Sequence, residues 1–243
     1  MSITASSLYR DTGNFFRHQL ITIVLMALLT SFITMLIGKA LTLGVDDIQI
    51  LGEGAADSAS GLMEMIRNMS PEQQQVLLHA SAADTFASLV GNVLLLGGTL
   101  SLIPLASSGS GQRISALRAI GASAPRLPAL LLVTILMTVL IQLSFMVLVV
   151  PGVLLAVTLA LSPIILMTEK VRVIAAMRAS MRLGWSQMKL IAPAVILWIV
   201  AKLVVVLASS LLPDVASVVL NALGNLVSAI LIIYLSRLYM LLR

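Results

Sequence analysis

A single lysine, Lys202, stands near the middle of a long apolar run and has the position most typical of a functional group. If that run crosses a bilayer, the charge costs about 2.5 to 3.5 kcal/mol on insertion scales, so it needs water or a polar partner. No acid lies within any long apolar run, so the candidate partners are amides: Asn221, Asn225, Asn92 and Gln142. This set could bind an anion or carry a proton. The favoured alternative is a lysine that snorkels or hydrogen-bonds between helices.

The other reactive residues exclude most catalytic and metal sites. The chain has no cysteine, which excludes thiolate nucleophiles, iron–sulfur clusters and cysteine zinc sites. Its two histidines, His18 and His79, have no companions at ligand spacing, and no apolar run supplies a histidine or an acid to activate a serine. We therefore predict that the protein is not an enzyme and that it binds no metal and no cofactor.

Polar residues recur at helical spacing along four of the apolar runs. They are Ser88, Asn92 and Thr99; Thr134, Thr138 and Gln142; Trp198, Lys202 and Ser209; and Ser217, Asn221, Asn225 and Ser228. Lipid provides no hydrophobic drive between helices, so small and polar residues are what allows them to pack. We expect these stripes to meet inside a helix bundle, with a solute pathway as the alternative.

The composition explains why apolar runs dominate the sequence. Of 243 residues, 59% are hydrophobic and only 10% are charged, and the mean hydropathy is +1.08. A soluble domain carries about 25% charged residues, so a water-exposed surface cannot be built from this chain. In a membrane protein an excess of lysine and arginine marks the cytoplasmic side of the membrane, so the net charge of +5 does not indicate a nucleic-acid partner, and none is predicted. The sequence predicts an all-α, polytopic membrane protein.

A transmembrane helix needs about 20 mainly apolar residues, and six runs approach or exceed that length. They cover residues 20–43, 86–106, 127–150, 152–167, 190–212 and 215–236, within a single membrane domain of residues 1–243. The first run exceeds the about 7 to 15 apolar residues of a secretory signal, so we expect an uncleaved anchor. Pro151-Gly152 and Pro213-Asp214 are the predicted turns of two helical hairpins.

The loop at residues 44–85 is the one sizeable segment outside the apolar runs. Ser70, Pro71 and Gln73 form a predicted capping box that starts a short helix towards Ala80, which could continue into the second span. A further amphipathic turn is predicted on the membrane surface from Leu62, Met65, Ile66 and Met69.

Lysine and arginine are distributed very unevenly between the two sides of such a bundle. Six spans with both termini on one side place twelve of the fifteen there: Arg10, Arg17, Arg113, Arg118, Arg126, Lys170, Arg172, Arg178, Arg182, Lys189, Arg237 and Arg243. The opposite side receives Arg67 and eight of the ten acids. The positive-inside rule therefore predicts cytoplasmic termini in a bacterial inner membrane.

Three basic amphipathic stretches each precede a span that leaves the cytoplasm. They cover residues 7–18, 113–126 and 170–189, and they hint at three tandem repeats of one amphipathic segment with one hairpin. In the third, one stripe contains Val171, Ile174, Met177, Met181, Trp185 and Met188. Such helices lie in the interface, so Arg172, Arg178, Arg182 and Lys189 are predicted to contact anionic lipid headgroups. Positive-inside topology alone would also produce these charges.

Four segments resemble the YciC family of enterobacterial inner-membrane proteins. They are residues 1–5 (MSITA), 9–17 (YRDTGNFFR), 111–125 (GQR and SALRAIGASAP) and 234–243 (YLSRLYMLLR). Pro151-Gly152, Pro163, Glu169-Lys170, Ser180 and Trp185 are also similar to a wider set of six-helix proteins, including the membrane domain of some glycerophosphodiester phosphodiesterases. Those relatives carry catalysis in a separate soluble domain. The resemblance therefore implies location and architecture, and it transfers no catalytic residue.

Two functions fit these observations. The first is a non-enzymatic inner-membrane protein that organises or senses the bilayer, or scaffolds partners, through its basic helices. The second is a small transporter or channel with a polar pathway around Lys202, although few ionisable residues lie within the spans.

Overall fold

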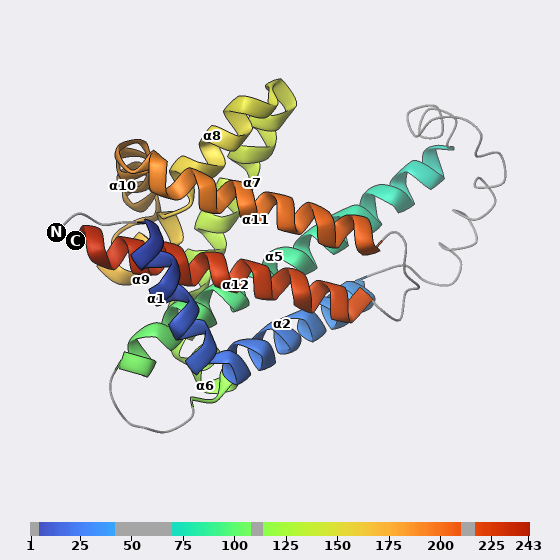
Figure 1. Ribbon diagram of the computed structural model, residues 1–243. Coiled ribbons are helices and arrows are strands. Elements are labelled where there is room, and N and C mark those ends of the chain that lie inside the picture. The colour runs from blue at the N-terminus through green and yellow to red at the C-terminus, as the bar shows by residue number, and fades with distance from the viewer. Residues whose placement is uncertain (1–4, 42–69, 108–113, 210–216) are drawn as a thin grey trace. The chain divides into compact units, whose positions relative to one another are not determined.

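The computed structural model describes residues 5–41, 70–107, 114–209 and 217–243, and every element in these ranges is helical (Figure 1). The helices are α1 (Ala5–His18), α2 (Leu20–Leu41), α5 (Pro71–Ser107), α6 (Ala116–Ser123), the 3-10 turn η2 (Ala124–Arg126), α7 (Leu127–Val147), α8 (Val149–Leu159), α9 (Ser162–Glu169), α10 (Val173–Ser186), α11 (Met188–Ser209) and α12 (Ser217–Leu242). Six stretches are long and apolar enough to cross a membrane: α2, α5, α6 with α7, α8 with α9, α11 and α12. The all-α, six-span prediction is confirmed. The predicted surface turn at residues 62–69, Arg113 and the turn at Pro213-Asp214 lie outside the described residues.

Two compact units divide the chain: Met1–Ser31 with Gly91–Arg243, called the large unit here, and Phe32–Val90. Within the smaller unit the predicted capping box begins α5. The Ser70 amide donates to Gln73 Oε1 (3.0 Å), and the Gln73 amide donates to Ser70 Oγ (3.2 Å). The helix does not stop near Ala80, because α5 continues without a break to Ser107.

The hairpin between α7 and α8 turns at Leu148, before the predicted Pro151-Gly152. Leu148 is extended (φ −160°, ψ 149°), and Pro151 lies in the first turn of α8. A proline is tolerated there because the backbone N–H groups of the first turn have no acceptor inside the helix, so a residue without an N–H loses no hydrogen bond. Gly152 provides room for the Phe145 ring, which a Cβ would overlap. In the fourth span, Pro163 stands in the first turn of α9, directly after the break that ends α8.

The core of the large unit consists of two clusters that share α12. One joins Leu130, Ile165, Ile191 and Leu238, from α7, α9, α11 and α12. The other joins α2, α5 and α12, and its members include Ile23, Met26, Leu102 and Ile233. Elsewhere on this unit large apolar side chains are exposed along α7 and α11, as expected of helices that face lipid.

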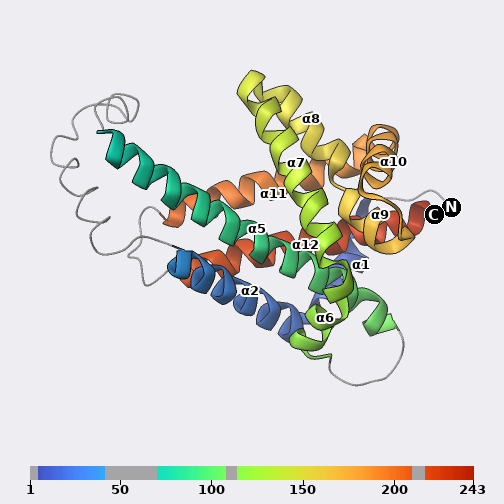
Figure 2. The ribbon, with the colours of Figure 1, turned by 180° about the vertical axis from the view of Figure 1, so that it is seen from behind.

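The amphipathic helices lie at one end of the large unit. Figures 1 and 2 show α1, α9, α10 and the C-terminal end of α12 together there. Helix α1 packs on α12, and α10 packs on α8 and α9. The cations of α1 and α10 therefore belong to the same end, which we call the basic end.

Candidate functional site

Helix α10 rests on α8 through a row of small side chains. Ala176, Ser180 and Gly184, spaced four residues apart, are all buried. Ser180 Oγ donates to the Thr158 carbonyl oxygen (2.7 Å). A Cβ on Gly184 would lie 2.6 Å from Thr158 Cα, so the two backbones are in direct contact. This close approach fixes the orientation of α10 about its own axis.

The opposite face of α10 is exposed and amphipathic. Ile174, Met181 and Trp185 are 68%, 40% and 59% exposed. Arg178 and Arg182 lie beside them, because residues three and four apart share a helix face. The four predicted lipid contacts, Arg172, Arg178, Arg182 and Lys189, are all exposed. The predicted apolar stripe is divided, since Val171, Met177 and Met188 pack against the core.

Two polar contacts hold the corner where α9 leads into α10. The Arg126 guanidinium donates to the carbonyl oxygens of Leu166 (3.2 Å) and Met167 (3.0 Å), near the end of α9. Tyr239 donates its hydroxyl hydrogen to Glu169 Oε1, which ties α12 to the same corner. Lys170 then adopts a left-handed backbone (φ 57°) that ends α9. Arg126, one of the twelve cations counted for topology, thus has a structural role.

Aromatic side chains fix α1 on α12. Leu8 and Thr12 are buried on the same face of α1. The rings of Tyr9 and Tyr234 have centroids 5.0 Å apart, and the Tyr234 hydroxyl donates to the Leu190 carbonyl oxygen (3.0 Å). One tyrosine of α12 therefore contacts both α1 and the first turn of α11.

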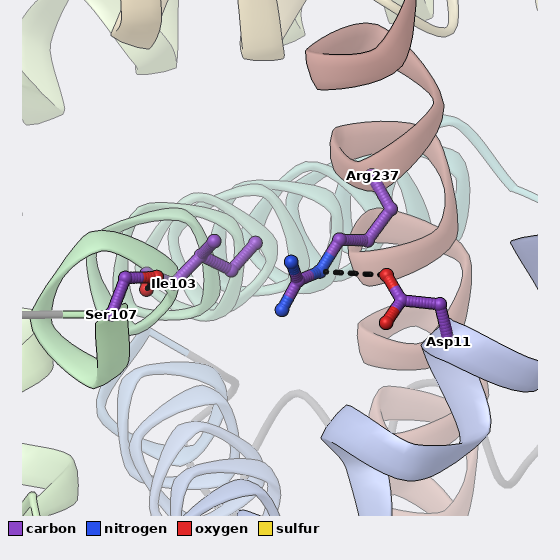
Figure 3. A network of polar contacts seen from close by, with 4 residues as sticks. All are labelled: Asp11, Ile103, Ser107 and Arg237. Carbon is purple, nitrogen blue, oxygen red and sulfur yellow. Dashed lines mark hydrogen bonds and ion pairs between the residues drawn. The ribbon is translucent and has the colours of Figure 1, made fainter. Parts of the chain in front are cut away.

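Arg237 adds a polar contact between α12 and α1. Its Nε lies 3.6 Å from Asp11 Oδ2, and its guanidinium carbon lies 4.9 Å from the centre of the Phe15 ring. Figure 3 shows the Arg237 side chain between Asp11 of α1 and the last turn of α5, where Ser107 Oγ donates to the Ile103 carbonyl oxygen (2.9 Å). Partly exposed ion pairs contribute only about 0 to 1 kcal/mol, so we regard this contact as positioning α1.

Helix α6 repeats the arrangement of α10 on a smaller scale. Ala116, Ala119 and Ser123 are buried. Ser123 lies against α5 at Gly97, where a Cβ would come within 2.7 Å of Ser123 Oγ. Leu117 is 69% exposed, and Arg118 next to it is exposed as well. Two of the three basic helices therefore dock through small residues and present an apolar residue with an arginine outward.

Lys202 lies between α11 and α12, half-buried on the backbone of Gly224. Its Nζ is 3.2 Å from the point that a Cβ on Gly224 would occupy, and its Cδ is 3.8 Å from the same point. The described part of the chain gives Lys202 no hydrogen bond and no ion pair. The glycine therefore provides the space in which this side chain is held.

The other four residues of the predicted polar site differ in their surroundings. Asn225 Nδ2 donates to Thr30 Oγ1 (3.1 Å) and to the Ala27 carbonyl oxygen (3.4 Å), so it joins α12 to α2. Asn221, Asn92 and Gln142 are exposed.

Polar residues nonetheless join neighbouring spans. Trp198 Nε1 donates to Ser228 Oγ (3.2 Å), so the stripes predicted on the fifth and sixth spans do meet. Ser31 Oγ donates to the Val218 carbonyl oxygen (3.0 Å). Sequence reasoning missed Thr30 and Ser31, although two adjacent hydroxyl residues within the first apolar run were a visible signal.

Comparison with known proteins gives a match over almost the whole chain. A family model described as "Uncharacterised protein family (UPF0259)" matches residues 1–241. The chain is 54% identical to a UPF0259 membrane protein of Pectobacterium carotovorum and to one of Serratia proteamaculans, with all of each chain covered. A UPF0259 membrane protein of Yersinia pestis is 47% identical over all of this chain and 97% of the relative. No solved structure gives a significant match.

Proposed function

Since this chain belongs to the UPF0259 family of membrane proteins, we propose that it is a non-enzymatic protein of the bacterial inner membrane that organises or senses anionic lipid through its basic interfacial helices. One observation carries the proposal: α10 contacts the α8 backbone at Gly184, and its opposite face presents Trp185 beside Arg178 and Arg182. Scaffolding of a protein partner on the same face is a variant of this function.

The physical basis is the chemistry of the membrane interface. Tryptophan is enriched at headgroup level, and each arginine near an anionic surface contributes about 1 kcal/mol of attraction. An amphipathic helix that is already docked on a transmembrane helix need not be ordered when lipid binds. The attraction is therefore not offset by a large loss of conformational entropy.

The transporter alternative has weaker support. Lys202 lies on Gly224, while Asn92, Asn221 and Gln142 are exposed and Asn225 is hydrogen-bonded to α2. Among the described residues, none of these amides forms a hydrogen bond with Lys202.

Topology is the first prediction of this proposal. Reporter fusions that require the cytoplasm are expected to be active after Arg118, Arg182 and Arg243, because the basic end should face the cytoplasm. A reporter that requires the periplasm should be active when fused at Asp57. Periplasmic activity after Arg182 would contradict both the orientation and the position of α10 at the inner leaflet.

The second prediction concerns the lipids around the full-length protein. Replacing Arg178, Arg182 and Lys189 by glutamine removes three exposed charges, and the ratio of phosphatidylglycerol to phosphatidylethanolamine around the protein should fall severalfold. The measurement is lipid analysis of the protein extracted from its membrane in polymer nanodiscs.

Replacing Arg178 and Arg182 by lysine is the matched control, since it keeps the charge and should keep most of the phosphatidylglycerol. Equal lipid ratios for the wild-type protein and the glutamine variant would show that these cations serve topology alone.

A further inference from the structure

A groove of about 880 Å³ opens where α1 leads into α2, within the large unit. It has four walls: the end of α1, the first half of α2, the last residues of α5 and the first turn of α6 with the two residues before it. Its lining includes Arg17, His18 and Gln19 at one end and Leu25, Leu29 and Leu105 on the apolar walls. Pockets that bind small molecules typically have about 300 to 1,000 Å³, so this groove is large enough for a substantial part of a lipid.

The lining changes from cationic to apolar along α2. Arg17 and His18 are exposed at the basic end, where α1 stops. Ile21 and Leu25, both more than half exposed, and the partly buried Leu29 follow along α2, away from that end. At about 1.5 Å per residue, Leu20 to Leu29 extends about 14 Å towards the membrane interior. A phospholipid has the same order of chemistry, with an anionic phosphate at the interface and acyl chains below it.

The walls of this groove are held by buried contacts and therefore exist before any ligand binds. Thr22 Oγ1 donates to the Ile114 carbonyl oxygen (2.9 Å), which fixes the residue pair before α6 against α2. Gly98 allows α5 to lie close to α2 and α6, since a Cβ at this position would overlap the Met26 sulfur and lie 2.9 Å from Ile120 Cγ1. A preformed site loses less entropy on binding than one that must be assembled.

We propose that this groove binds one anionic phospholipid of the inner leaflet, with its phosphate at Arg17 and one acyl chain against Leu25 and Leu29. The proposal rests on the proposed function and names a specific site for it. Arginine suits the headgroup, because its guanidinium fork matches two phosphate oxygens. The apolar wall provides the second half of the recognition, since a free phosphate ion would gain nothing from it.

Native mass spectrometry of the full-length protein in detergent, titrated with phosphatidylglycerol and with phosphatidylethanolamine of identical chains, tests the site. The first phosphatidylglycerol should bind more tightly than the first phosphatidylethanolamine. Arg17→Gln should weaken the binding of phosphatidylglycerol by about fivefold, which is the change expected for one cation at an anionic surface. Arg17→Lys should retain most of the binding affinity. Inorganic phosphate should not compete, because it lacks the chain.

Leu25→Trp provides an independent test by filling the groove. It should lower the occupancy of both lipids, whereas Leu203→Trp, at a comparably exposed leucine on α11, should leave both unchanged. The melting temperature of each variant shows that it is folded. Wild-type phosphatidylglycerol binding by both folded groove variants would overturn the proposal.

The glutamine variant of α10 separates this site from the general function. It should leave the first phosphatidylglycerol bound, because none of its three changed residues lines the groove. Loss of that lipid in the α10 variant, with normal binding in the groove variants, would place the tight site at α10 and refute the groove. Unchanged nanodisc lipids in the α10 variant, with weakened binding in Arg17→Gln, would refute the function assigned to α10 and keep the groove.

Discussion

Replacing Gly184 by leucine is expected to push α10 off α8 and to destabilise the folded protein. A side chain at this position meets backbone atoms, with Thr158 Cα at 2.6 Å and the Thr158 oxygen at 2.9 Å from an ideal Cβ. Overpacking typically costs about 1 to 3 kcal/mol even where flexible side chains can yield, and backbone atoms yield less. The displaced helix should also lose the bond from Ser180 to the Thr158 carbonyl oxygen.

The measurement is thermal unfolding of the purified protein in detergent. The melting temperature of Gly184→Leu should fall well below that of the wild-type protein. Gly121→Ala is the matched control, because a Cβ on this α6 glycine meets no atom within 4 Å and alanine favours the helix by about 0.5 to 1 kcal/mol. If Gly184→Leu melts like the wild type, α10 does not rest on the α8 backbone.

Replacing Lys202 by methionine is expected to stabilise the bundle. The change removes a charge whose insertion costs about 2.5 to 3.5 kcal/mol at the bilayer centre. This cost is smaller where the lysine side chain can extend to the outer end of the span and place its charge at the interface. Within the described ranges no hydrogen bond or ion pair is lost in exchange. Thermal unfolding in liposomes should therefore show a higher melting temperature for Lys202→Met.

Lys39→Met is the control for this change. Lys39 lies in the last turn of α2 and is exposed, so its removal should have a smaller effect. Ion and small-anion flux through the same liposomes should be identical for the wild-type protein and Lys202→Met. If the wild-type protein supports a flux and the folded Lys202→Met variant does not, the transporter alternative gains support instead.

The number and approximate positions of the spans could be predicted because each span requires about 20 mainly apolar residues, and runs of about that length are separated by charged or turn-forming residues in this chain. The start of α5 was also predictable, since Ser70 and Gln73 form a local motif whose two hydrogen bonds need no distant partner. The turn at Leu148 was not predictable in the same way. Pro151 is compatible with the first turn of a helix, and the position of the break depends on how Phe145 packs on Gly152.

The polar contacts between spans show a second limit of the sequence. The spacing of polar residues on α12 marks the face that carries Asn225, but spacing along one helix does not say which side chain of another helix it meets, so Thr30 on α2 could not be identified as its partner. Helix α10 differs, because its cations and apolar residues alternate with helical period and mark its outer face. The identity of the inner partner, the backbone around Thr158, depends on tertiary packing.

Trp185 lies on the exposed face of α10 and reports directly whether that face selects anionic lipid. The chain has two tryptophans, so Trp198→Phe leaves Trp185 as the only one. Quenching of its fluorescence by brominated phosphatidylglycerol and by brominated phosphatidylethanolamine, in bilayers that contain both, measures which lipid lies beside the helix. Stronger quenching by the anionic lipid at low salt, diminished at high salt, is the predicted result. Equal quenching by the two lipids at every salt concentration would show that α10 does not select anionic lipid.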